Sequence, residues 1–142
     1  MTTTPKTRGG RFEQKVSRIL RNTISKELVV VRGSSQGKIF LKKTQKDPDY
    51  ILKSSANTPK AAVECKYVSS KSSPASYWTQ MARGYTLLND IRIRYPRVSC
   101  FLVVNRENDS MDYSKLFRKA GIKYIVLNEQ EKEFRRLLKK IK

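Results

Sequence analysis

Two short apolar segments carry charged residues where a buried β-strand would normally have none. In Ala62-Val63-Glu64-Cys65-Lys66-Tyr67, strand alternation puts Glu64 and Lys66 on one face. Burying a charge is costly unless it is paired or binds a metal. Asp49 opens the preceding apolar segment, and a hairpin would bring it close to Glu64. We therefore expect a sheet that holds two carboxylates together, as hard-oxygen ligands suited to Mg²⁺.

The charge of the chain indicates a polyanionic partner. Its 142 residues include 31 Lys and Arg against 12 Asp and Glu, a formal net charge of +19. This excess exceeds what solubility requires and is typical of proteins that bind nucleic acid. A non-catalytic binding protein would have the same charge balance, so charge alone leaves an enzyme and a binder open. The length predicts one domain at 11–142, after a flexible basic arm at 1–10.

The absence of histidine excludes several mechanisms. Histidine general bases, Ser-His-Asp triads, His-ligated zinc and the HNH and ββα-metal nucleases all need that residue. For phosphodiester hydrolysis, the remaining means are a carboxylate-bound metal and a lysine. Cys65 and Cys100 are too few for structural zinc and lie in predicted strands, so we expect buried free thiols in a reducing cytosol. No secretory signal and no membrane-spanning apolar stretch is visible, which predicts a cytoplasmic protein without a membrane partner.

Hydrophobic periodicity predicts alternating strands and helices. Helices are expected at 11–24, 74–90, about 112–120 and 128–142, and strands at 27–32, 38–41, 49–53, 61–68, 98–105 and 122–127. Ser73 and Pro74 form a helix start, and Asn128 is expected to cap the last helix. Gly121 should end the short helix, which Ser110 or Asp112 could cap. The pattern predicts an α/β fold with a central mixed sheet flanked by helices.

One stripe on the second helix is expected to pack on the sheet: Tyr77, Trp78, Met81, Tyr85 and Leu88. Gln80 lies beside this stripe and is either a partly exposed helix residue or a site residue. Glu13 is either a helix-start acid favoured by the helix dipole or an extra carboxylate for the metal site.

Two loops before Asp49 each have a structural and a functional interpretation. Ser34 and Ser35 could be turn residues only, or could contact a phosphate. Lys42 and Lys43 could belong to a solvated loop, or could contact the DNA backbone.

Pro48-Asp49 followed by Glu64-Cys65-Lys66 resembles the signature of the PD-(D/E)XK nuclease superfamily. Within that superfamily, residues 10–104 are most similar to the archaeal-type Holliday junction resolvases. The similarity rests on the order of these features: Gly10 and Glu13, a strand ending at Arg32, the loop with Ser34, Ser35 and Gly37, Pro48-Asp49 with Ile51, and Val63-Glu64-Cys65-Lys66. Gln36 separates Ser35 from Gly37, whereas the family's loop has serine directly before glycine, so a catalytic role for either serine is left open.

The resemblance implies a restriction-endonuclease-like core and a Mg²⁺ site in which Mn²⁺ could substitute. Asp49, Glu64 and the backbone carbonyl of Cys65 would hold the metal. Lys66 would orient or deprotonate the attacking water, or stabilise charge on the phosphate. Glu13 would complete the site directly or through water. Supporting or DNA-contacting roles would fall to Arg32, Ser34, Ser35, Lys42, Lys43 and Gln80.

The leading hypothesis is a Mg²⁺-dependent, structure-selective DNA endonuclease that resolves four-way junctions as a homodimer, associated with the nucleoid. Its partner would be branched DNA. The alternative within the superfamily is a small type II restriction enzyme or a viral or repair nuclease. The alternative outside it is a non-catalytic basic nucleic-acid-binding protein, which leaves Asp49, Glu64 and Lys66 without a role.

Overall fold

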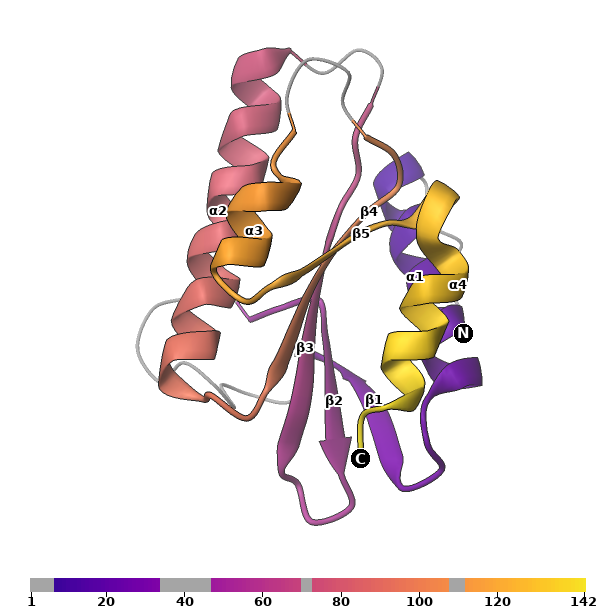
Figure 1. Cartoon of the computed structure of the whole chain (residues 1–142). Helices are drawn as coiled ribbons and strands as arrows, with labels where there is room; N and C mark the ends of the chain where they lie inside the picture. Colours follow the sequence, from indigo (N-terminus) through magenta and orange to yellow (C-terminus); the bar gives the residue numbers. More distant parts are fainter. Residues whose placement is uncertain (1–6, 34–46, 70–72, 108–111) are drawn as a thin grey trace.

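A computed structural model describes residues 7–33, 47–69, 73–107 and 112–142 (Figure 1). Its elements in chain order are α1 (Arg8–Thr23), β1 (Leu28–Arg32), β2 (Tyr50–Ser54), β3 (Pro59–Lys66), α2 (Pro74–Arg94), β4 (Ser99–Val104), α3 (Ser114–Lys119), β5 (Lys123–Val126) and α4 (Leu127–Lys139). The strand predicted at 38–41 lies outside the described residues, as do Ser34, Ser35, Lys42, Lys43 and Ser110.

The strands of the described residues form one five-stranded sheet in the order β1-β2-β3-β4-β5, and the sheet is mixed, as predicted. Strands β1, β2 and β3 are antiparallel neighbours, whereas β3, β4 and β5 run parallel. Parallel neighbours need a crossover connection, which α2 supplies between β3 and β4. In the β2–β3 hairpin, Tyr50 pairs with Val63. This register brings Asp49, just before Tyr50, beside Glu64.

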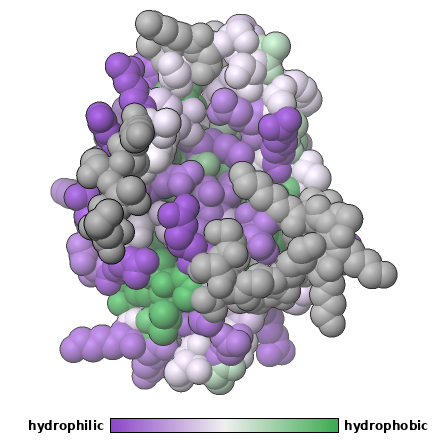
Figure 2. Space-filling model, turned by 180° about the vertical axis from the view of Figure 1, so that it is seen from behind, coloured by the Kyte–Doolittle hydropathy of each residue, from purple (hydrophilic) through white to green (hydrophobic). Residues whose placement is uncertain are grey.

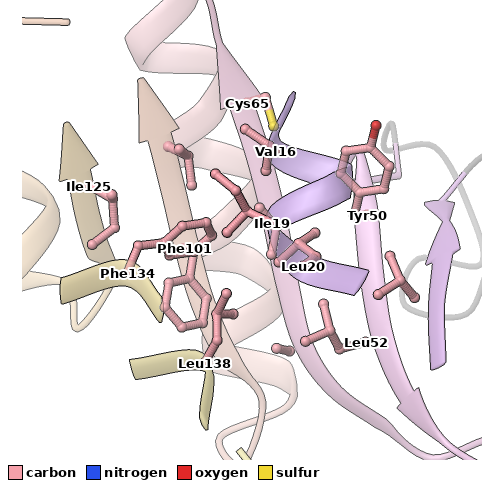
Figure 3. Close-up of a cluster of buried hydrophobic side chains, with 14 of the residues drawn as sticks. Val16, Ile19, Leu20, Tyr50, Leu52, Cys65, Phe101, Ile125, Phe134 and Leu138 are labelled. Atoms are coloured by element: carbon pink, nitrogen blue, oxygen red, sulfur yellow. The ribbon is translucent and has the colours of Figure 1, made fainter. Parts of the chain in front are cut away.

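Helices cover the two faces of the sheet in separate layers (Figure 1). On one face, α2 and α3 pack over a core that includes Leu88, Leu102 and Phe117. On the other face, α1 and α4 pack over a second core, where the rings of Phe101 and Phe134 meet edge to face at 5.7 Å (Figure 3). Among the described helices, none combines the length and apolar character needed to cross a membrane.

Helix α1 begins three residues earlier than its apolar periodicity predicts. The Thr7 side chain accepts a hydrogen bond from the Gly10 backbone N–H (3.0 Å), which caps the helix and draws Arg8 to Gly10 into it. The predicted arm at 1–10 was therefore too long. The remainder of the helix follows the predicted stripe, with Val16 and Leu20 fully buried.

Helix α2 begins as predicted, because Ser73 accepts the Ser76 N–H (3.1 Å) and Pro74 occupies the first turn. It continues past the predicted end near Asp90 to Arg94, and the Asp90–Arg94 ion pair (2.9 Å) spans its last turn. The prediction that Trp78 packs on the sheet was wrong. Its side chain is 53% exposed, whereas Tyr77 beside it is fully buried.

The ends of the last two helices differ in how well sequence signals located them. Gly121 has the left-handed conformation (φ 77°) predicted for the end of α3. The N-cap of α3 is Tyr113 and not the predicted Asp112, although Asp112 accepts the Ser114 N–H (2.9 Å) from the position before it. The predicted Asn128 cap of α4 was wrong, because the helix begins at Leu127 and Asn128 donates to the Asn105 carbonyl (3.3 Å). The helix is also kinked at Gln130 (φ −123°).

Candidate active site

Asp49, just before β2, and Glu64, near the end of β3, are held by reciprocal hydrogen bonds. The Asp49 backbone N–H donates to Glu64 Oε1 (3.1 Å), and the Cys65 backbone N–H donates to Asp49 Oδ2 (2.8 Å). Each carboxylate is therefore fixed by the backbone of the strand that carries the other. Asp49 Oδ1 accepts no hydrogen bond from the described residues. The predicted proximity of the two acids is confirmed.

Glu64 is a buried charge with a nearby cation. Its carboxylate is 2% exposed, and Oε2 lies 3.3 Å from the ammonium nitrogen of Lys66, whose side chain is 14% exposed. Both side chains lie on one face of the sheet, as alternation predicts, and residues of α2 line the same hollow. A buried carboxylate costs free energy unless its oxygens are satisfied, and here a backbone N–H and an ammonium group satisfy them.

Two glycines allow close packing around these residues, and the sequence interpretation assigned neither to the site. A Cβ on Gly33 would overlap the Pro48 carbonyl oxygen and lie 2.9 Å from Asp47 Cβ, while the Gly33 N–H donates to the Asp49 carbonyl (3.2 Å). A Cβ on Gly84 of α2 would lie 3.0 Å from Cδ1 of Leu102 and 3.4 Å, an ordinary contact, from Cε of Lys66. Gly33 thus lets β1 approach the Asp49 backbone, and Gly84 lets α2 pack closely on Leu102 beside the lysine stem.

Cys65 can contribute its backbone to the site, whereas its thiol stays neutral. Burial raises the pKa of the thiol well above its ordinary value, and the charges of Asp49, Glu64 and Glu13 raise that pKa further. In a strand, the N–H and C=O of one residue point toward the same neighbour. The Cys65 carbonyl is therefore directed to the side where its N–H meets Asp49.

Glu13 lies in α1, and its charge acts on Cys65 together with those of Asp49 and Glu64. Its carboxylate forms an ion pair with Arg32 (3.7 Å), and its backbone carbonyl accepts the Tyr50 hydroxyl (3.0 Å). Burial is the main reason why the pKa of Tyr50 is raised, which keeps this hydroxyl a donor. The predicted site residues Glu13 and Arg32 therefore lie next to each other. A contact between Glu13 and a metal, directly or through water, stays a prediction.

A hollow of about 650 Å³ opens beside the charged pair. It is lined by Glu64, Lys66, Trp78, Thr79, Ala82, Arg83, Thr86 and Leu87. Gln80, a predicted supporting residue, is half-buried and is not one of the lining residues. Sequence reasoning missed Arg83 and Thr86, although their spacing from Thr79 places all three on one side of α2.

The donor set fits a hard divalent cation better than a soft one. Within the described ranges there is no group of three or more His, Cys, Asp or Glu side chains arranged to hold a metal. A cation bound here would therefore use the carboxylates of Asp49 and Glu64 with the Cys65 carbonyl, and would complete its shell with water or phosphate oxygens. Such oxygen ligation, with several waters retained, is typical of Mg²⁺.

Comparisons with protein-family models, with curated proteins and with solved structures return no significant match.

Proposed function

We propose that this protein is a metal-dependent DNA endonuclease of the PD-(D/E)XK superfamily, with a restriction-endonuclease-like core. The observation that carries this proposal is the setting of Glu64. Its carboxylate is 2% exposed, is held by the Asp49 N–H and the Lys66 ammonium, and still lines a hollow of about 650 Å³. Buried charges of this kind at the wall of a cavity are typical of functional sites.

Asp49, Glu64 and the Cys65 carbonyl are the residues that would hold Mg²⁺, or Mn²⁺ in its place. When bound, the cation supplies an activated water and offsets the negative charge that builds on the phosphate. The fit rests on the donor chemistry, since Cys65 Sγ is kept neutral by burial and all remaining donors are oxygens.

Lys66 and Arg83 supply the cationic groups that a phosphodiester needs. The Lys66 ammonium group stays beside Glu64 and at the wall of the hollow, where it can hold a water or donate to a phosphate oxygen. Arg83 is exposed on the same wall and can bind the DNA backbone. The net charge of +19 also favours a polyanionic substrate. Seen from behind, the coloured surface is mostly hydrophilic, with one hydrophobic patch (Figure 2).

In its finer form, the proposal is a homodimer that cleaves branched DNA such as four-way junctions. A restriction or repair nuclease of the same superfamily would use the same residues on linear DNA. The second candidate function is non-catalytic binding of nucleic acid, which the charge supports equally well.

The test is Glu64→Gln, which keeps the shape of the side chain and removes its charge. We expect Mg²⁺-dependent cleavage of DNA to fall by about 10²-fold or more, because an electrostatic element of the reaction site is lost. DNA binding should change little, since Glu64 is buried and bears the wrong charge to bind phosphate. Gel assays of cleavage and of binding measure the two effects, and circular dichroism checks folding.

Glu129→Gln is the matched control, because Glu129 is exposed on α4. This variant should cleave as the wild type does. Undiminished cleavage by a folded Glu64→Gln variant would contradict the assigned site. If the wild type binds DNA but cleaves no substrate with either metal, the binding protein is the better description.

A further inference from the structure

Trp78 has an unusual position for the chain's single tryptophan. Its side chain is 53% exposed on α2 and lines the same hollow as Glu64 and Lys66. Its ring also packs against Tyr113, with 5.9 Å between the ring centroids and 36° between the planes. The indole is therefore supported by another ring and at the same time exposed at the wall of the candidate active site.

The surroundings of Trp78 separate it from an ordinary exposed apolar residue. Ile93 on the same helix is 65% exposed but lines neither this hollow nor the smaller one beside it. That smaller hollow, about 190 Å³, lies against Trp78, Tyr85 and Tyr113. A large aromatic surface next to two hollows, rather than on a flat surface, suits a planar ligand that stacks.

The polar lining of the larger hollow indicates what kind of planar ligand fits. Lys66 and Arg83 provide positive charge, and Thr79 provides a hydroxyl group. An apolar protein partner would leave these groups without suitable contacts, whereas a nucleotide offers a phosphate to the cations and a base to the indole. Stacking on an aromatic side chain is how proteins bind unpaired bases without reading sequence.

We propose that Trp78 is a stacking platform for an unpaired DNA base next to the cleaved phosphate. The substrate class is then DNA with an unpaired or unstacked nucleotide at the cleavage point, such as a branch or a single-stranded segment. This inference rests on the proposed nuclease function. A paired base inside a duplex has its faces covered by its neighbours, so it would have to leave the stack to reach Trp78.

The experiment uses Trp78 as its own reporter, with the full chain and EDTA present so that DNA is bound but not cleaved. Three probes of equal length are titrated: single-stranded oligothymidylate, the same strand with abasic residues, and a fully paired duplex. We expect strong quenching of the tryptophan emission by oligothymidylate. The abasic strand, which keeps the phosphates and lacks the bases, should quench weakly, and so should the duplex.

Three variants test whether stacking contributes to affinity. By fluorescence anisotropy of labelled DNA, Trp78→Ala should weaken binding of oligothymidylate by about 5- to 150-fold, the loss of one stacked base. Trp78→Phe, which keeps a ring, should retain much of the affinity. The control Ile93→Ala should bind as the wild type does, because Ile93 is exposed on the same helix away from the hollows.

Equal quenching by the abasic strand, or unchanged affinity of Trp78→Ala, would overturn the stacking proposal. A loss of self-association by Trp78→Ala with unchanged DNA affinity would assign this surface to a second copy of the chain instead. Quenching without any Mg²⁺-dependent cleavage by the wild type would leave stacking supported and contradict the nuclease. If the wild type cleaves DNA and Trp78→Ala cleaves it equally well, the nuclease is supported and the stacking role of Trp78 is contradicted.

Discussion

At Cys100, burial predicts a measurable pH dependence of stability. The thiol is 1% exposed in β4, and burial is the main cause that raises its pKa from 9.0 to about 11. The folded chain thus keeps a proton that the unfolded chain releases. The stability contributed by the neutral thiol is complete below pH 9 and is lost as the pH rises toward 11.

Between pH 7.5 and pH 10, Cys100→Ala should therefore lose about 1.4 kcal/mol less unfolding free energy than the wild type. Urea unfolding of both proteins at the two pH values measures this difference. The comparison cancels the titration of the other groups, including Cys65, because both proteins carry them. Identical losses would contradict the raised pKa.

For single residues, the face of the sheet could be predicted where it depends only on position within one strand. Alternation was enough to put Glu64 and Lys66 on one face, because a strand has a period of two residues. Gly33 was not predictable as a site residue. Its role depends on how closely β1 approaches Pro48, which is set by the pairing of distant segments and not by local sequence.

The contact between β1 and the segment before β2 leaves no room for a side chain. A Cβ at position 33 would overlap the Pro48 carbonyl oxygen, so Gly33→Ala must displace the backbone that precedes Asp49. We expect the variant to lose about 1–3 kcal/mol of stability, the usual cost of overpacking. Mg²⁺-dependent cleavage should fall at least about 10-fold, because Asp49 moves from its bond with Cys65.

Gly9→Ala is the matched control for that substitution. Among the described residues, a Cβ at position 9, in the first turn of α1, meets only Tyr67 Cβ, at an ordinary 3.8 Å. This variant should gain up to about 1 kcal/mol and keep full activity, since alanine favours the helix. Urea unfolding and the cleavage assay compare both variants. Wild-type activity in Gly33→Ala would show that Asp49 does not need the close approach of β1.

For helices and strands, local sequence signals located the starts of elements and the turns better than they located the ends of elements or the burial of their side chains. Ser73 and Pro74 marked the start of α2 because capping involves only neighbouring residues. The start of α4 was misplaced because the backbone of Asn128 is bonded to Asn105, a contact between distant segments. Trp78 was wrongly predicted to pack on the sheet. Helical spacing gives the direction of a side chain, but it does not say how far the neighbouring elements extend over that side chain.

Across the whole molecule, the arrangement of layers brings the candidate site to one end of the sheet. Glu64 and Lys66 reach it from β3, Asp49 from the start of β2, and Thr79 and Arg83 from α2. The order of the motifs along the sequence predicted the strand contribution. The contribution of α2 could not be predicted, because it depends on where the crossover helix lies over the sheet.

For the proposed DNA substrate, the net charge of +19 on 142 residues would favour recognition of DNA shape and backbone over recognition of bases. If the chain acts as a homodimer, two identical sites would face two strands related by symmetry. We therefore expect the wild type with Mg²⁺ to nick a synthetic four-way junction symmetrically near its crossover, where nucleotides unstack most readily. A linear duplex of the same sequence should stay intact.

Denaturing gels of junctions labelled on each strand would map the nicks, and sedimentation would give the stoichiometry of the complex. Glu64→Gln serves as the inactive control, because it should bind the same junction without cutting it. Cleavage of the linear duplex at one fixed sequence would favour the restriction enzyme instead. The homodimer would be contradicted if the protein sediments as a monomer and nicks one strand only. Symmetric cuts depend on two copies of Asp49 and Glu64 that act on opposite strands.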